Sequence, residues 1–208
     1  DGMDRQMMHH YGSMSADIRP LWRTRAVGIA RTVRYVPYEG TIPTMTPEKY
    51  GEWSSWFGRE KQQWGWEDET REGDFVVIDQ SETNVGLMGS FSALRGLSNG
   101  ARGYVTNGGV RDTDELIETM VPFWSRSIAQ TMVQGRIQFD AKDVMVSVGG
   151  VVVRPGDVVV ADGDGVIVVP RKLACGVAEW ARKSLEKDKV NRRRVYDKLG
   201  RDPDETVS

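Results

Sequence analysis

The chain has 208 residues, with 28 Lys and Arg against 30 Asp and Glu, and a formal net charge of -2. This length supports one substantial core, so we expect a single domain over residues 1–208. The nearly balanced charge argues against a nucleic-acid partner, and Arg192-Arg193-Arg194 lies among acidic residues as on a solvated helix face. No apolar run in the sequence approaches the length of a membrane span, so no membrane partner is expected.

Cysteine content points to a reduced, cytoplasmic compartment. Cys175 is the only cysteine, so no intrachain disulfide can form. Its neighbours are small and apolar, which predicts a small buried residue and not a nucleophile. Because the chain begins at Asp1, a targeting segment removed upstream stays an alternative to a protein without one.

The first residues carry Met3, Met7 and Met8 at roughly helical spacing, which predicts a short amphipathic helix over residues 1–14. His9 and His10 are the only histidines. Neighbours on a helix point in different directions, so this pair is a poor metal chelator.

Two strands are predicted next, at residues 25–36 and 73–79, where small and β-branched residues dominate. Between them, residues 37–71 read as an irregular insertion that is dense in tryptophan. This insertion is either a lid or subunit contact, or a cluster that covers one edge of the sheet. Its tryptophans are Trp53, Trp56, Trp64 and Trp66.

Residues 86–97 read as a glycine-rich entry into a helix. The free N–H groups at the start of such a helix can bind a carboxylate. Its apolar residues, expected to face the core, are Met88, Phe91 and Leu94 or Leu97.

The rest of the chain is organised around residues 103–112, a buried strand predicted to run into a tight turn at Gly108-Gly109. The strand stops on Arg111 and Asp112, and a helix-like segment follows over residues 112–120. A guanidinium can grip a carboxylate or keto oxygen, and an adjacent carboxylate can hold a hard divalent cation. The plainer interpretation is a turn closed by a local ion pair.

From residue 144 the pattern changes to short strands cut by turns, and the chain closes with a long charged helix over residues 171–199. Asp162-Gly163-Asp164-Gly165 resembles the start of a calcium loop, but its twelfth position is Leu173, so a hairpin turn is predicted. Together the elements indicate a mixed α/β layer fold. The predicted strands are 144–148, 151–154, 158–161 and 166–169.

Four motifs in the second half of the chain have a distinctive order and spacing. They are Gly108-Gly109-Val110-Arg111-Asp112, Val121-Pro122-Phe123, the segment 148–157 (VGGVVVRPGD) and the segment 161–170 (ADGDGVIVVP). In this order they resemble the RraA-like family, which includes the 4-hydroxy-4-methyl-2-oxoglutarate (HMG/CHA) aldolases. Residues 27–33 and 73–79 look like two early strands of that family, so the resemblance covers most of residues 15–185.

The resemblance implies a swivelling β/β/α sandwich that assembles into a homotrimer or homohexamer, with the site at a subunit boundary. The Trp-rich insertion at 37–71 and a C-terminal helical extension at 171–208 fall outside it. By the same resemblance, Arg111 contacts the pyruvoyl group of a 2-oxo acid and Asp112 holds Mg²⁺ or Mn²⁺, in part through water. The loop that would receive the substrate carboxylate is Gly89, Ser90, Phe91 and Ser92.

The implied activity is that of a class II aldolase, which cleaves a 4-hydroxy-2-oxo acid to pyruvate and a carbonyl product. Oxaloacetate decarboxylation would accompany it, because both reactions form the pyruvate enolate that a metal and Arg111 can stabilise. Related aldolases often have an acid where this chain has Ser90, so the proton acceptor stays open between Asp79, Asp114 and an acid of a neighbouring subunit. The alternative is a protein-binding regulator like the RraA inhibitors of RNase E, which keep the Arg–Asp pair.

Overall fold

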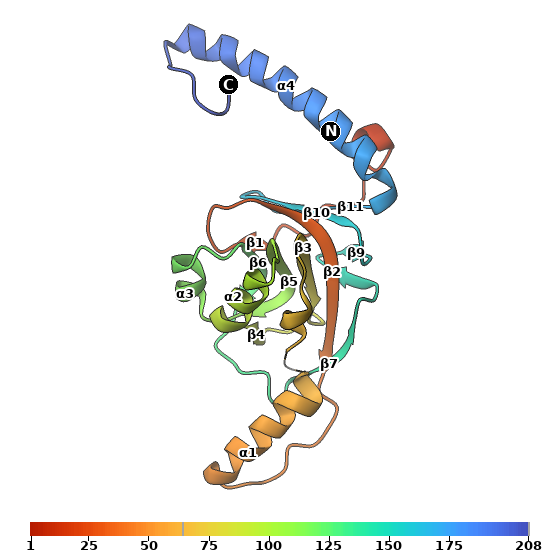
Figure 1. Ribbon diagram of the computed structural model, residues 1–208, viewed down its shortest axis with the longest axis vertical. Helices are drawn as coiled ribbons and strands as arrows, with labels where there is room; N and C mark the ends of the chain where they lie inside the picture. The colour runs from red at the N-terminus through yellow and green to blue at the C-terminus, as the bar shows by residue number, and fades with distance from the viewer. Residues whose placement is uncertain (64, 208) are drawn as a thin grey trace. The chain divides into compact units, whose positions relative to one another are not determined.

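The computed structural model describes residues 1–63 and 65–207, so Trp64 of the predicted insertion lies outside the described residues. The chain divides into two compact units. The central unit is Gly12–Val168, and the terminal unit combines Asp1–Tyr11 with Val169–Ser208. Figure 1 traces the elements of both in chain order by colour.

The strands lie in the central unit, except for the last residue of β11, and the long helix α4 belongs to the terminal unit. The strands are β1 Arg19–Pro20, β2 Ala26–Pro37, β3 Asp74–Asp79, β4 Gly86–Met88, β5 Gly103–Val110, β6 Phe123–Ile128, β7 Ile137–Lys142, β8 Val146–Val148, β9 Val151–Val153, β10 Val158–Ala161 and β11 Val166–Val169. The helices are η1 Asp4–Gln6, α1 Pro47–Phe57, η2 Gly58–Gln62, η3 Trp66–Glu69, α2 Ser90–Ser98, α3 Thr113–Glu118, η4 Arg171–Leu173 and α4 Ala174–Leu199.

A mixed sheet forms the frame of the central unit. Its strand order is β1-β6-β5-β3-β2-β10-β11, with β4 added to β5 and β7 to β2. The middle strands β2, β3, β5 and β6 run parallel, whereas β1, β7 and β10 pair antiparallel to their neighbours. Parallel strands need cover on both faces, and β3 and β5 are accordingly buried along most of their length.

The two faces of the sheet carry two separate hydrophobic clusters, as the alternation along β3 illustrates. Val76 and Ile78 belong to the cluster beneath the helices, which also takes in Ala93 of α2 and Leu116 of α3. Phe75 and Val77 belong to the opposite cluster, together with valines of the β8–β9 hairpin and of β10 and β11. The result is a β/β/α sandwich with a strongly curved sheet, in which α2 and α3 lie together against the sheet (Figure 1). The predicted fold class is confirmed.

Residues 37–63 and 65–71 include the helices α1, η2 and η3, contrary to the prediction of an irregular insertion. Helix α1 begins after Thr46, with Pro47 in its first turn, where proline lacks only a donor that would be unpaired anyway. It runs into the π-helical turn η2, and the buried side chains of Phe57 and Trp66 join the cluster beneath the helices. The indole Nε1 of Trp66 donates a 2.9 Å hydrogen bond to the hydroxyl of Tyr35. This packing agrees with the interpretation of the insertion as a cluster that covers the sheet.

Two local predictions were wrong for steric reasons. Gly108 and Gly109 are not a turn but the last part of β5, where Cβ atoms would collide with Gln80 and Ala129 respectively. Phe91 is 75% exposed instead of buried. In α2 the small residues face the sheet, because the Tyr104 hydroxyl takes up the space beneath the helix. This hydroxyl donates a hydrogen bond to Ala93 O.

Leu94 is likewise exposed, although Met88 and Leu97 do pack against the core as predicted. Strands β6 and β7 were not predicted. β7 carried a usable signal, since Ile137, Phe139 and Ala141 alternate with polar residues.

The terminal unit corrects two further predictions. Instead of an amphipathic helix over residues 1–14, the chain forms the short turn η1, which ends at Met7 in the left-handed region with φ 59°. Cys175, predicted to be buried, is exposed on α4. The predicted charged helix is confirmed as η4 and α4. Of the helices described, none is long and apolar enough to cross a membrane.

The insertion should contribute to stability through Phe57, which contacts the rings of Tyr38 and Trp53. Phe57→Ala leaves a cavity in the core and should lower the free energy of unfolding by about 3–5 kcal/mol, measured by urea denaturation. Trp56→Ala, on the same helix but 38% exposed, is the control and should cost far less. Equal losses in the two variants would contradict this packing.

Candidate functional site

The site begins where two parallel strands end side by side. β4 pairs with β5, so that Met88 lies opposite Val110, and the N–H of Arg111 donates a 3.0 Å hydrogen bond to Met88 O. The next residue after each strand, Gly89 and Arg111, therefore leaves the sheet at the same edge. The carboxyl ends of parallel strands are where α/β proteins bind their ligands.

Gly89 is required at this edge because there is no room for a side chain. A Cβ built on it would overlap the carboxylate of Asp112 and lie 3.0 Å from Cζ of Arg111. Its φ of -129° is accessible to any residue, so the requirement is space and not backbone conformation. The missing side chain allows the Arg111–Asp112 pair to lie directly against the start of α2.

Arg111 and Asp112 form an ion pair with 2.8 Å between Nη1 and Oδ2, and each side chain is 32% exposed. Asp112 precedes α3 with φ 55°, in the left-handed region, which turns its carboxylate back toward α2. There Oδ2 also accepts a 3.3 Å hydrogen bond from the N–H of Ser90. Both contacts of this carboxylate within the described residues use Oδ2, so Oδ1 is available to a cation or its water.

A second carboxylate, that of Glu115, stands beside the pair. The hydroxyl of Ser90 donates to Glu115 Oε2. Glu115 follows Asp112 by three residues at the start of α3, which puts the two side chains on one side of the helix. Ser90 thus bridges the two acids, its N–H to Asp112 and its hydroxyl to Glu115.

Glu115 was not among the acids proposed from the sequence, although its spacing from Asp112 was a usable signal. Asp79, which was proposed, is engaged in a structural network elsewhere. Its carboxylate accepts hydrogen bonds from Nδ2 of Asn107 at 2.8 Å and from the N–H of Ser147 at 3.4 Å. Asp114, the other acid of this chain that was proposed, is exposed on α3.

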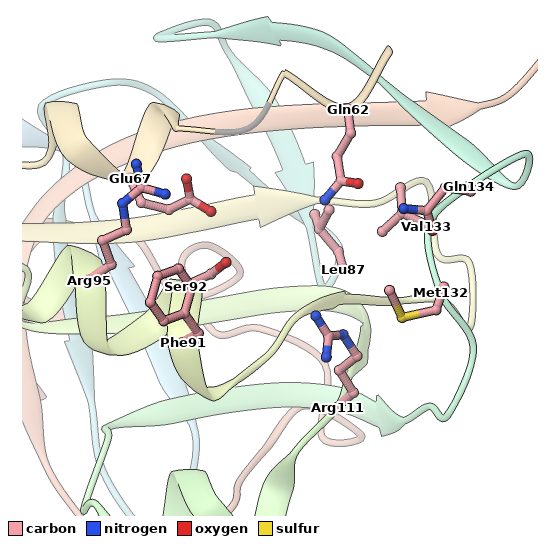
Figure 2. A pocket seen from close by; sticks show the side chains of 10 residues that line it. All are labelled: Gln62, Glu67, Leu87, Phe91, Ser92, Arg95, Arg111, Met132, Val133 and Gln134. Carbon is pink, nitrogen blue, oxygen red and sulfur yellow. The ribbon is translucent and has the colours of Figure 1, made fainter. Parts of the chain in front are cut away.

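A cavity of about 290 Å³ opens beside Arg111. Figure 2 shows that the guanidinium of Arg111 and the amide of Gln62 point toward the same space from opposite walls. The insertion, α2, the end of β5 and the β6–β7 connection all contribute to the lining. The lining residues are Gln62, Glu67, Leu87, Phe91, Ser92, Arg95, Arg111, Met132, Val133 and Gln134.

Three polar atoms of the cavity walls have no hydrogen-bond partner within the described part of the chain. They are Nε of Arg111 and the Oε1 atoms of Gln62 and Gln134, all of them buried. Buried polar groups are nearly always paired, because an unpaired one costs about 1–3 kcal/mol. Their concentration around one cavity indicates a polar ligand.

Two charged side chains also line the cavity, Arg95 from α2 and Glu67 from η3. Arg95 donates from Nε to Asp68 Oδ1 at 2.6 Å, and this hydrogen bonding raises the pKa of the guanidinium. Glu67 is only 5% exposed, and its Oε2 accepts from the N–H of Gly65 at 3.1 Å. Burial raises the pKa of the Tyr104 phenol, and the negative charge of Glu67 raises it further.

The available ligands suit one kind of metal. Across residues 1–63 and 65–207 no group of three or more His, Cys, Asp or Glu side chains converges as a metal cage. Asp112 Oδ1, with Ser90 and Glu115 beside it, instead provides a few hard oxygen donors at a partly exposed position. Mg²⁺ keeps several waters and binds through one or two carboxylates, so these residues fit that cation.

The curved β/β/α sandwich with its site at the ends of β4 and β5 defines the class of protein. Residues 1–168 match the RraA-like family, described as Aldolase/RraA. The chain belongs to this family.

Solved structures agree with the assignment. An uncharacterized protein from Pseudomonas syringae pv. tomato str. DC3000 is 26% identical, with a TM-score of 0.73 over 94% of this chain and 85% of that one. Streptomyces coelicolor RraAS2, described as an unusual member of the RNase ES inhibitor RraA family, is 25% identical, with a TM-score of 0.76 over 92% and 89%. The RNA-processing inhibitor RraA from Thermus thermophilis shares the fold at 23% identity and a TM-score of 0.58, over 82% and 92%. No curated protein matches.

The structure brings most of the predicted site residues together. Gly89, Ser90, Arg111 and Asp112 are in mutual contact or adjacent, and Phe91 and Ser92 line the cavity next to them. Their roles in binding a metal and a 2-oxo acid stay predictions. The cavity residues from the insertion and from the β6–β7 connection were not foreseen.

Gly89→Ala tests the close approach of the two strand ends. The added methyl should displace the Asp112 carboxylate and weaken Mg²⁺ or Mn²⁺ binding by about tenfold or more, measured by calorimetry. Gly51→Ala is the control, because a Cβ on Gly51 meets no atom within 4 Å and should not weaken the fold. Unchanged metal affinity in Gly89→Ala, with both variants folded, would contradict this account.

Proposed function

We propose that the protein is a divalent-metal-dependent lyase of the class II aldolase type, which cleaves a 4-hydroxy-2-oxo acid to pyruvate and a carbonyl product. One observation carries the proposal. Arg111, paired with Asp112, lines a 290 Å³ cavity, and its Nε is buried and unpartnered within the described residues. A guanidinium held by a carboxylate on one side can offer its remaining N–H groups to a carboxylate or keto oxygen on the other.

Asp112 would hold the metal through Oδ1, and Ser90 and Glu115 would contact its waters. Mg²⁺ or Mn²⁺ bound there supplies positive charge next to the oxygen that becomes negative as the carbon–carbon bond breaks. The ion pair to Arg111 keeps Asp112 Oδ2 occupied, so the carboxylate has one defined direction in which to bind the cation.

The chain's own groups account for the rest of the reaction. Arg111 orients the 2-oxo acid and stabilises the enolate oxygen, and N–H groups at the start of α2 receive the substrate carboxylate. Glu115, held by Ser90, accepts the proton of the C4 hydroxyl, directly or through one water. In this proposal Glu115 supplies the acid that related aldolases carry at the position of Ser90.

The same enolate forms when oxaloacetate loses CO₂, so we propose that activity as a companion. We further propose a cytoplasmic homotrimer or homohexamer, without a nucleic-acid or membrane partner. A second candidate function is a protein-binding regulator, favoured by the likeness to Streptomyces coelicolor RraAS2 over 92% of this chain. A regulator needs the fold but not metal-dependent turnover.

Exchange of the pyruvate methyl protons in D₂O separates the two candidates, because it reports enolate formation without any second substrate. Exchange and oxaloacetate decarboxylation that require Mg²⁺ or Mn²⁺ and stop with EDTA are the expected results. Absence of both, in protein shown to bind metal, would reject the lyase. Absence of metal binding as well would favour the regulator.

Asp112→Asn removes the charge that would anchor the metal but keeps the shape of the side chain. It should weaken Mn²⁺ binding by at least about tenfold and lower the metal-dependent exchange rate by about 10²-fold or more. Asp114→Asn, two residues further along the chain and exposed, makes the same chemical change and should leave both quantities unaltered. Retention of full affinity by Asp112→Asn would remove Asp112 from the metal site.

Glu115→Gln distinguishes proton transfer from metal binding. The amide keeps a hydrogen-bond acceptor for Ser90 but is no base, so cleavage of 4-hydroxy-4-methyl-2-oxoglutarate to pyruvate should fall by about 10²–10⁴-fold while metal affinity changes little. Glu118→Gln on the same helix is the control. A fall in metal affinity that matches the fall in rate would instead make Glu115 a metal ligand alone.

A further inference from the structure

The two ends of the cavity beside Arg111 differ in charge. At one end the charges of Arg111 and Asp112 balance, so a bound divalent cation would make this end positive. Glu67 and Arg95 line the other end, and Arg95 is neutralised by its pair with Asp68, which lies outside the lining. This second end is therefore negative by one charge. Figure 2 shows Glu67 and Arg95 together on one side of the opening and Arg111 on another.

The carboxylate of Glu67 is the source of this excess. Asp68 is committed to Arg95 through two hydrogen bonds, one from Nε and one from Nη2. Glu67 is buried at 5% exposure, and no ion pair to it exists within the described residues. Its only side-chain hydrogen bond there comes from the N–H of Gly65, so its carboxylate retains acceptor capacity toward the cavity.

Two amides add uncharged hydrogen-bonding groups to the same walls. Gln62 comes from the end of η2 and Gln134 from the β6–β7 connection, and each has a buried, unpartnered Oε1. Gln134 is 5% exposed, so its amide is almost wholly removed from bulk water. An amide both donates and accepts, which matches hydroxyl groups better than it matches a carboxylate, an acceptor only.

We infer that the cavity takes a 4-hydroxy-2-oxo acid whose far end, beyond the hydroxyl-bearing carbon, is uncharged and hydroxylated. This inference rests on the proposed function and specifies its substrate. The 2-oxo acid end would lie at Arg111 and Asp112, and the hydroxylated tail would reach Glu67, Gln62 and Gln134. A tail with a second carboxylate would meet the charge of Glu67 in a buried place, where like charges repel strongly.

The reaction on such a substrate balances without any co-reactant. The C3–C4 bond breaks with its electron pair moving to C3, and the C4 hydroxyl proton leaves to Glu115 as C4 becomes an aldehyde. The enolate then takes a proton at C3, which gives pyruvate and a hydroxyaldehyde. The proton lost from the C4 hydroxyl and the one gained at C3 are equal in number, so the products are the substrate divided in two.

The test compares two acceptors for pyruvate in the reverse, carbon–carbon bond-forming direction, glyceraldehyde and glyoxylate. Glyceraldehyde leads to a hydroxylated tail and glyoxylate to a second carboxylate. The wild-type protein with Mg²⁺ should favour glyceraldehyde in kcat/KM by about tenfold or more. Glu67→Gln keeps an acceptor for Gly65 and should shift this ratio toward glyoxylate by about tenfold.

Glu69→Gln is the matched control, since Glu69 lies in the same helical turn but pairs with Arg31 and Lys142 outside the cavity. It should leave the ratio unchanged. Pyruvate proton exchange, which involves no acceptor, is measured on all three proteins. Exchange without a preference for glyceraldehyde, or a ratio unmoved by Glu67→Gln, overturns this inference alone. Loss of exchange in the wild type overturns the proposed function itself.

Discussion

The parallel pairing of β4 with β5 is the constraint on which the candidate site depends. It places the residues that follow Met88 and Val110 at one edge of the sheet, although 22 residues separate Ser90 from Asp112 along the chain. The absence of a side chain at Gly89 then lets the Arg111–Asp112 pair touch the start of α2. Backbone geometry and one missing Cβ thus fix the position of a guanidinium and a carboxylate on which any chemistry here relies.

The sheet can serve as this frame because it is covered on both faces. Alternating residues of β3 enter different clusters, so a shift of one residue would exchange the two sets and disrupt both. Tyr104 shows how tightly the helical layer fits. Its hydroxyl occupies the space that a side chain at Gly96 would need, and it fixes the height of α2 through Ala93 O. The helix that presents Ser90 is therefore positioned by packing more than by its own propensity.

Much of the fold, and the centre of the site, could be predicted from the sequence. Strand composition located β2, β3 and the short strands after residue 144, and the resemblance to the RraA-like family linked Arg111 and Asp112 to the loop at Gly89. The failures have a common cause. Gly108-Gly109 looks like a turn in isolation, and only the neighbouring Gln80 and Ala129 explain why a strand needs glycine there. Gln62, Glu67 and Gln134 could not be assigned to the cavity, because no local pattern shows that the insertion and the β6–β7 connection meet across it.

The residues that could be predicted and those that could not lie on different walls of the cavity. Arg111, paired with Asp112, follows β5, and in the proposed function its chemistry concerns the 2-oxo acid. The opposite walls come in part from η2 and η3, within the Trp-rich insertion, and their groups can only contact whatever extends beyond that acid. Phe57 and Trp66 anchor the insertion in the core, so Gln62 and Glu67 are held by packing and not by a free loop. If the proposed function holds, the reaction depends on Arg111 and Asp112, and the packed insertion selects the substrate.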